Sequence, residues 1–256
     1  MALKKSEQET TRVLTALVAT YRSTIDFFAK KDLVVKQFHP TPFPDWQRSD
    51  RHFNLISANA RQVIRCEPNR IIVRAEGYPA LSAFEEVVTI ARRILEEFDV
   101  KDLFSATYQS VRARPMKSLE EARTRFVQKF LGDRAVHLLT YDELSDFAVT
   151  VERGWPATTD FRKVKATLAK LNVRERVALG PVSYDEIGEK FVEFRRNAEN
   201  VLYRGAHMAP RFAILADAVF TIDRRKDVDA LALDLLWRFY DWAKATNDGT
   251  WKQLEG

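Results

Sequence analysis

Lys and Arg residues are grouped at three places along the chain. Among the features of this sequence, these groups give the clearest indication of a chemistry. Lys and Arg neutralise the phosphates of nucleic acids, so one joined basic surface would bind DNA or RNA. The acidic residues Asp223, Asp227 and Asp229 reduce the local positive charge of one of these groups. Nucleic-acid binding is therefore the alternative hypothesis and not the leading one. The candidate nucleic-acid-binding residues are Arg112, Arg114, Lys163, Lys165, Arg174, Arg176, Arg224, Arg225 and Lys226.

Motifs for catalysis or cofactor binding are not found in the sequence. Its histidines, His39, His52, His137 and His207, include no pair at the spacing that puts two metal ligands on one helical face. The glycines form neither GxGxxG nor GxxxxGK[ST], the backbone cradles that hold nucleotide phosphates. Cys66 lacks the flanking residues of a catalytic cysteine. We therefore predict no catalytic residue, no cofactor and no metal site.

Two carboxylates leave a third hypothesis open, that of a metal-dependent hydrolase. Asp217 interrupts the apolar segment ILADAVF, and Asp223 follows on the same face of the expected strand. On a straight strand the two residues would lie about 20 Å apart, which is too far for one metal ion. This hypothesis is therefore the least favoured of the three.

Phe43 and Trp46 are the candidate partner-binding residues. They lie in HPTPFPDWQRSD, residues 39–50, where alternating prolines favour an extended path. Aromatic side chains in such a segment more often pin it to the body of the protein, and less often face a protein partner. Both roles remain open at this point.

The first 32 residues are expected to form an amphipathic helix. Ser6 and Glu9 have capping-box spacing, and apolar residues then recur at intervals of three and four. Residues 33–51 would follow as a stiff, proline-rich connector. The apolar stripe of the predicted helix consists of Leu14, Leu17, Val18, Tyr21, Ile25 and Phe28.

From residue 52 onward the same order of elements occurs twice, which predicts two similar α+β halves, 52–140 and 141–256. Each half would contain paired strands, a capped helix, a long strand that ends in basic residues, and another helix. Hairpin connections favour mainly antiparallel sheets with helices on one face. The expected elements are 52–77, 82–98, 103–114 and 118–131, then 146–179, 183–199, 211–223 and 228–246.

Composition is typical of a globular protein without a membrane segment. The chain has 256 residues, 46% of them hydrophobic, and no apolar run approaches the length of a membrane span. We expect no secretory signal, because no apolar region follows the charged start. A single cysteine fits a reducing compartment, so a cytoplasmic location is predicted.

Two stretches resemble a sporadically distributed family of uncharacterised prokaryotic proteins of similar length. They are NRIIVRAEGYPALSAFEEV and FTIDRRKDVDALALDLLWRFYDWAKATNDGTWKQL, and the resemblance extends over much of residues 53–256. The long N-terminal helix and the proline-rich connector depart from the family pattern. The resemblance implies a bacterial or archaeal cytoplasmic protein, scattered as genes of mobile elements or defence often are, with no active site to transfer.

The leading hypothesis is a non-enzymatic binding or assembly protein of a prokaryotic cytoplasmic complex. Its partner would be another protein or a second copy of the chain. This hypothesis follows from an apolar content sufficient for a core together with the lack of a recognisable catalytic motif.

Overall fold

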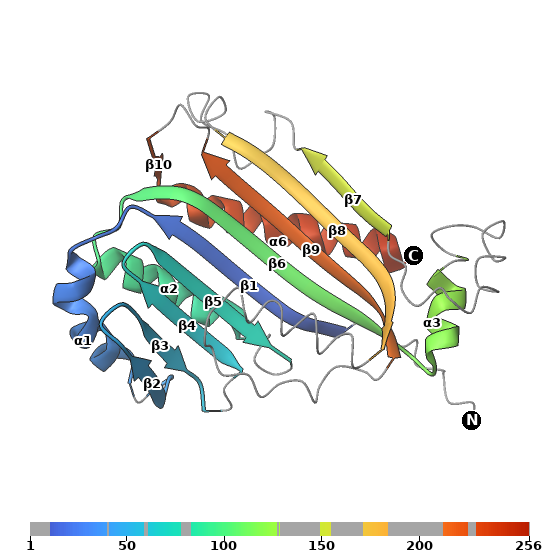
Figure 1. Cartoon of the computed structure of the whole chain (residues 1–256), viewed down its shortest axis with the longest axis horizontal. Coiled ribbons are helices and arrows are strands. Elements are labelled where there is room, and N and C mark those ends of the chain that lie inside the picture. The colour runs from blue at the N-terminus through green and yellow to red at the C-terminus, as the bar shows by residue number, and fades with distance from the viewer. Residues whose placement is uncertain are drawn as a thin grey trace.

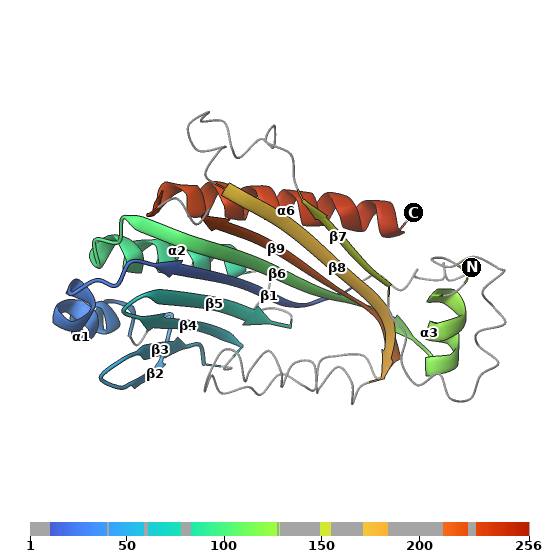
Figure 2. The same ribbon diagram turned by 45° about the horizontal axis from the view of Figure 1, so that its top comes forward.

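The fold is a single large, twisted antiparallel sheet with helices on one face (Figures 1 and 2). The structure is a computed structural model. It describes residues 11–39, 41–58, 61–77, 83–126, 128, 149–154, 171–183, 212–224 and 229–255. The sheet has ten strands in the order β2-β3-β4-β5-β1-β6-β9-β8-β7, and β10 pairs with β6. Every pairing is antiparallel. The predicted α+β class with antiparallel sheet is therefore confirmed.

The strands differ greatly in length, and the longest ones form the centre of the sheet. The strands are β1 (Thr11–Tyr21), β2 (Asp45–Arg48), β3 (Phe53–Ile56), β4 (Gln62–Glu67), β5 (Arg70–Glu76), β6 (Asp102–Met116), β7 (Val149–Gly154), β8 (Leu171–Ser183), β9 (Phe212–Arg224) and β10 (Leu231–Ala232).

The helices that cover the sheet are α1 (Asp26–Phe38), α2 (Phe84–Glu97) and α6 (Asp234–Glu255). A fourth helix, α3 (Leu119–Phe126), lies at the far end of the long strands (Figure 1). The core lies between the sheet and the three covering helices, where aromatic rings such as Phe27, Phe98 and Tyr108 are buried. Burial of these large apolar side chains is the main source of stability for this layered arrangement.

The first hairpin and the helix that follows it form where the sequence predicts them. Pro68 and Asn69 make the two-residue connection between β4 and β5. The α2 helix buries the apolar face that its spacing indicates, from Phe84 to Leu95. At α3 the backbone N–H of Glu121 donates to Ser118 Oγ at 3.1 Å, so Ser118 caps the start of this helix.

Residues 11–21 form a central strand, so the predicted N-terminal helix was wrong. β1 pairs with β5 on one side and with β6 on the other. Leu17 and Ala19 are buried under the helices, while Leu14 and Ala16 are buried on the opposite face. A strand buried on both faces carries a near-continuous apolar run, and periodicity alone does not distinguish such a run from a helix. Only the last part of the predicted helix, from Asp26, is helical.

The predicted connector, residues 33–51, is only partly a connector. Residues 33–38 complete α1, and Asp45–Arg48 form the edge strand β2. Pro44 directly precedes this strand, which fits the tolerance of sheet edges for proline.

The internal duplication is not confirmed. The β5–α2–β6 connection passes over β1, so β1 separates β5 from β6 in the sheet. In the second half β8 lies directly beside β9. The two halves therefore repeat an order of elements without repeating the neighbours of each strand. The second-half helix expected at 183–199 and the strand expected at 161–168 lie outside the described residues, except for Ser183, which ends β8.

The last helix is longer than its stop signal indicates. We expected an end before Asn247-Asp248-Gly249, yet α6 continues to Glu255. Asn247 is buried, and Asp248 forms an ion pair with Arg112 of β6. These contacts with the sheet stabilise a segment whose own helix propensity is poor. Within the part of the chain that the structure describes, no helix is long and apolar enough to span a membrane.

Candidate functional site

A groove opens between α1 and the edge strand β2. Its volume is about 500 Å³, and it is lined by Asp32, Val35, Lys36 and His39 of α1 or its C-cap and by Trp46 and Arg48 of β2. The spacing 32, 35, 36 and 39 places the first four residues along one stripe of the helix. Trp46 and Arg48 lie opposite the core residues Leu55 and Phe53 in the register, so both face the helix side of the sheet.

Polar contacts hold the two walls of this groove together. Arg48 Nη1 donates to Asp32 Oδ1 at 2.8 Å, and its guanidinium carbon lies 5.3 Å from the centre of the Trp46 ring. Lys31 Nζ donates to the carbonyl oxygens of Ser49 and Asp50 in the turn after β2. The edge strand is therefore fixed relative to α1, which preorganises the groove for a binding partner.

In the sheet that the described residues form, β2 is an edge strand, and its backbone offers hydrogen-bonding groups on the side away from β3. Ser49 N–H donates to the His52 carbonyl at 2.8 Å, so Ser49 and His52 form a hydrogen-bonded pair. Such pairs alternate along antiparallel strands, which makes Gln47–Asn54 and Asp45–Ile56 the next ones. The backbone groups of the intervening residues, Trp46 and Arg48, therefore point away from β3.

Proline limits how far this open edge extends. Residue 44 has the same phase as residues 46 and 48, and Pro44 has no N–H to donate. The edge therefore presents the N–H and C=O groups of Trp46 and Arg48, the same residues whose side chains line the groove.

The exposed large hydrophobic side chains of the described residues all belong to α1, its N-cap and β2. They are Ile25 at 83%, Phe28 at 53%, Leu33 at 56% and Trp46 at 37% exposure. Phe28 continues the α1 stripe formed by Asp32, Val35 and His39. We call these four residues together with the groove the α1–β2 surface. Phe28 and the groove lie along one side of α1, and an exposed apolar patch beside a groove is a mark of an interaction site.

The two predicted partner-binding residues have different positions. Phe43 is buried in the core, where it pins the segment to the body of the protein. Trp46 lies at the surface and lines the groove, and its ring centre is 6.4 Å from that of His39. Of the pair, Trp46 alone is exposed.

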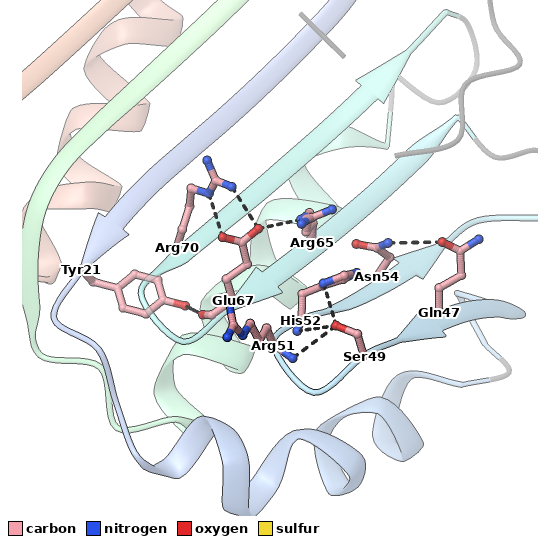
Figure 3. Close-up of polar contacts among 9 residues, drawn as sticks. All are labelled: Tyr21, Gln47, Ser49, Arg51, His52, Asn54, Arg65, Glu67 and Arg70. Carbon is pink, nitrogen blue, oxygen red and sulfur yellow. Dashed lines mark hydrogen bonds and ion pairs between the residues drawn. The ribbon is translucent and has the colours of Figure 1, made fainter. Parts of the chain in front are cut away.

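A polar cluster covers the opposite face of strands β2 to β5 (Figure 3). Glu67 accepts hydrogen bonds from Arg65 Nε at 2.7 Å and from Arg70 Nη2 at 3.0 Å. Arg74 and Glu76, 2.9 Å apart, form a second ion pair on the next strand. Both pairs have the spacing Arg-x-Glu, which puts the two side chains on one face of a strand.

The carboxylate of Glu67 is held in its ionised form by its two arginine partners. Burial alone would raise the pKa of Glu67, but hydrogen bonds from Arg70 and Arg65 and their positive charges lower that pKa below its ordinary value. A carboxylate of this kind does not donate a proton at neutral pH. The arrangement thus fits a structural network better than general acid catalysis.

Cys66 and Tyr21, which lie beside Glu67, remain protonated. Burial and then the charge of Glu67 raise the pKa of the Cys66 thiol. Burial also raises the pKa of the Tyr21 hydroxyl, which donates to the Glu67 carbonyl at 2.8 Å. The thiol lacks the electropositive surroundings of a nucleophile.

The basic strand ends lie at opposite ends of the sheet. β6 and β9 are antiparallel, with Arg112 opposite Ala216 and Ser105 opposite Asp223. Arg224 therefore lies level with Phe104, and its guanidinium is 4.9 Å from that ring. Positions 104 and 112 are eight residue steps apart, which corresponds to about 27 Å along the strand. Arg112 and Arg224 therefore lie apart along the strands, and the expectation that the basic clusters join into one surface stays a prediction.

The remaining candidate nucleic-acid-binding residues are divided between other places. Arg112 forms its ion pair with Asp248, while Arg114 lies two residues further along β6. Arg174 and Arg176 lie in β8, where Arg176 stands opposite Glu152 of β7. The last four candidates, Lys163, Lys165, Arg225 and Lys226, lie outside the described residues.

The carboxylates of the hydrolase hypothesis both lie in β9. Asp217 stands opposite Val111 and Ala178, and Asp223 stands opposite Ser105 and Asn172. Over the described ranges, no group of three His, Cys, Asp or Glu residues is placed to hold a metal ion.

Comparison with known proteins does not assign the chain to a family. No family model matches it, and no curated protein is similar to it. The resemblance to an uncharacterised prokaryotic family therefore stays a prediction.

Sequence reasoning missed most of the groove. Val35, Lys36 and His39 fall in the segment predicted as a connector, and Asp32 is the last residue of the predicted helix, so the sequence analysis did not indicate that the four share one helical stripe. The stripe from residue 28 to residue 39 is the signal that could have revealed one wall. Arg48 carried no sequence signal of its own, because its role depends on the position of the edge strand.

Proposed function

We propose that this protein is a non-enzymatic binding or assembly protein of a prokaryotic cytoplasmic complex, and that its partner binds at the α1–β2 surface. The observation that carries the proposal is that Ile25, Phe28, Leu33 and Trp46, the exposed large hydrophobic residues among those described, all belong to α1, its N-cap or the edge strand beside it. Burial of such a patch by another protein removes apolar area from water.

An extended segment of the partner fits this surface best. The N–H and C=O groups of Trp46 and Arg48 face outward, so an added strand can form main-chain hydrogen bonds to β2. Side chains of that strand would lie over the groove beside Trp46. Strand addition gains its affinity from the main chain and its specificity from such side-chain contacts.

The other two hypotheses have less support. Nucleic-acid binding would require a continuous basic surface, whereas Arg112 and Arg224 are separated along the sheet. Hydrolysis would require carboxylates that converge near Asp217, and among the described residues no group of three His, Cys, Asp or Glu is placed to hold a metal ion. The prokaryotic and cytoplasmic parts of the proposal rest on the sequence resemblance and on the single cysteine.

Site-specific photo-crosslinking in the native cell tests the proposal. A photoreactive amino acid replaces Asp45, which is exposed at the β2 edge, and in a matched control it replaces Glu96 on the outer face of α2. We expect an adduct from position 45 and none from position 96. A Trp46→Ala substitution in the position-45 variant should remove the adduct.

The mass of the adduct also shows what the partner is. An adduct that depends on Trp46 supports the proposal, whatever its mass. No adduct from position 45, or an adduct unaffected by Trp46→Ala, overturns it.

A further inference from the structure

The open edge of β2 is self-complementary. It presents two residues, Trp46 and Arg48, whose N–H and C=O groups point outward and which are separated by Gln47. We propose that the partner at the α1–β2 surface is a second copy of this chain, and that β2 pairs antiparallel with β2 of that copy about a two-fold axis through Gln47. This inference rests on the proposed function and names its partner.

The phase of the hydrogen bonds restricts the register of this pairing. Outward-pointing residues must face each other to exchange N–H···O bonds. With the axis at Gln47, Trp46 faces Arg48 of the second copy and Arg48 faces its Trp46, so all outward groups of both residues are bonded. An axis at Arg48 would instead place two guanidinium groups directly opposite each other, which is unfavourable.

The side chains are complementary in the same register. Each Arg48 would lie across from a Trp46 ring, and within one chain this pair already forms a contact of 5.3 Å. The two Gln47 amides would meet at the axis on the other face and can hydrogen-bond to each other. A two-fold symmetric dimer requires a self-complementary surface of this kind.

Several features of β2 limit which strands can pair with this edge. β2 is four residues long, follows Pro44, and carries Asp45 and Arg48, which are features that prevent indiscriminate pairing of sheet edges. The four main-chain hydrogen bonds between the two copies of β2 would by themselves make only a small interface. The exposed Phe28 and Leu33 on α1 must therefore contribute apolar area, and we expect a dissociation constant that is roughly micromolar.

Disulfide trapping tests the register. Facing residues of a non-hydrogen-bonded pair have Cα atoms about 4.5 Å apart, which suits a disulfide. Purified Gln47→Cys should therefore cross-link to a dimer under mild oxidation. In Asp45→Cys, the matched control, the two cysteines would be about 14 Å apart and should stay reduced. The natural Cys66 is buried and does not interfere.

Sedimentation of the purified full chain tests the association itself. The wild-type chain should shift from monomer to dimer as its concentration rises. Trp46→Val keeps the outward N–H but loses the ring, and should weaken association by about tenfold or more. Trp46→Pro also loses the N–H and should remain monomeric. Both variants should fold, because the Trp46 N–H does not bond to β3. Circular dichroism checks this.

Each outcome decides the inference. Concentration-dependent dimers together with selective trapping at position 47 support it. A chain that stays monomeric at all concentrations, or one in which positions 45 and 47 cross-link equally, overturns it. If the photo-crosslink from position 45 captures a protein of another mass in the cell and the purified chain is monomeric, this inference fails while the proposed function stands.

Discussion

Glu67 shows how individual residues stabilise the face of the sheet opposite the helices. Its carboxylate lies between Arg65, which is almost fully buried, and Arg70, which is partly exposed. Removal of one partner from such a network leaves the other charges without compensation, which costs more than the pair contributes to stability.

We expect Glu67→Gln to lower the free energy of unfolding by about 2 kcal/mol at pH 7. Because the folded-state pKa of Glu67 is lowered, its contribution is present above its unfolded-state pKa and is lost as pH falls through the folded-state value. The difference between wild type and variant should therefore shrink below about pH 4. Urea unfolding at both pH values measures it.

The exposed pair Arg92–Glu96 provides the matched control for this prediction. Glu96→Gln should change stability by less than about 0.5 kcal/mol at either pH. A difference for Glu67→Gln that grows on acidification would contradict the account of the network.

Cys66 is a direct reporter of core opening. The thiol is buried in β4, and burial raises its pKa, so the reactive thiolate is suppressed in the folded protein. We expect negligible alkylation of the native protein at pH 8 and full alkylation in denaturant, measured by mass spectrometry. Rapid labelling of the native protein would show that the strand is less buried than described.

At the scale of elements, α6 illustrates how tertiary contacts extend a helix beyond its own sequence signals. Asn247-Asp248-Gly249 is a stop signal, yet the helix continues because Asp248 pairs with Arg112 on β6. Helix propensity is a weak effect that such contacts override.

Loss of this ion pair should destabilise the end of α6. We expect Asp248→Ala to cost about 2 kcal/mol and to accelerate hydrogen exchange in residues 249–255. Asp241→Ala, at an exposed position on the same helix, should leave that exchange unchanged. Equal exchange in the two variants would indicate that Arg112 does not hold the helix end.

The elements also differ in how well the sequence predicts them. α2 and the β4–β5 hairpin have one apolar face or a clear turn, so their periodicity is unambiguous. β1 is buried on both faces, and its apolar run resembles a helical stripe. The groove combines residues 32–39 with residues 46–48, and no local pattern indicates that a helix and an edge strand meet there.

At the scale of the whole molecule, the sheet ends in two edges, and the described helix α1 borders only one of them. β2 forms the edge beside α1, and β7 forms the other. Among the described residues, the exposed large hydrophobic side chains belong to β2 and to α1 with its N-cap, the helix that borders the first edge.

The separation of the basic clusters has a consequence for nucleic-acid binding. Because Arg112 and Arg224 lie about 27 Å apart along the strands and Arg112 is paired with Asp248, we expect them not to act as one phosphate-binding surface. We expect no retention on DNA or RNA at physiological salt, measured across a salt series. Retention that falls steeply with salt would contradict this prediction.

The most direct test of the central claim is hydrogen exchange at the backbone amides of β2. The claim is that the outward N–H groups of Trp46 and Arg48 become hydrogen-bonded when the edge is occupied. In the assembled state these two amides should exchange about tenfold more slowly than in the monomer, whereas those of Asp45 and Gln47, already bonded to β3, should not change. Equal exchange of Trp46 and Arg48 in the two states would contradict the account.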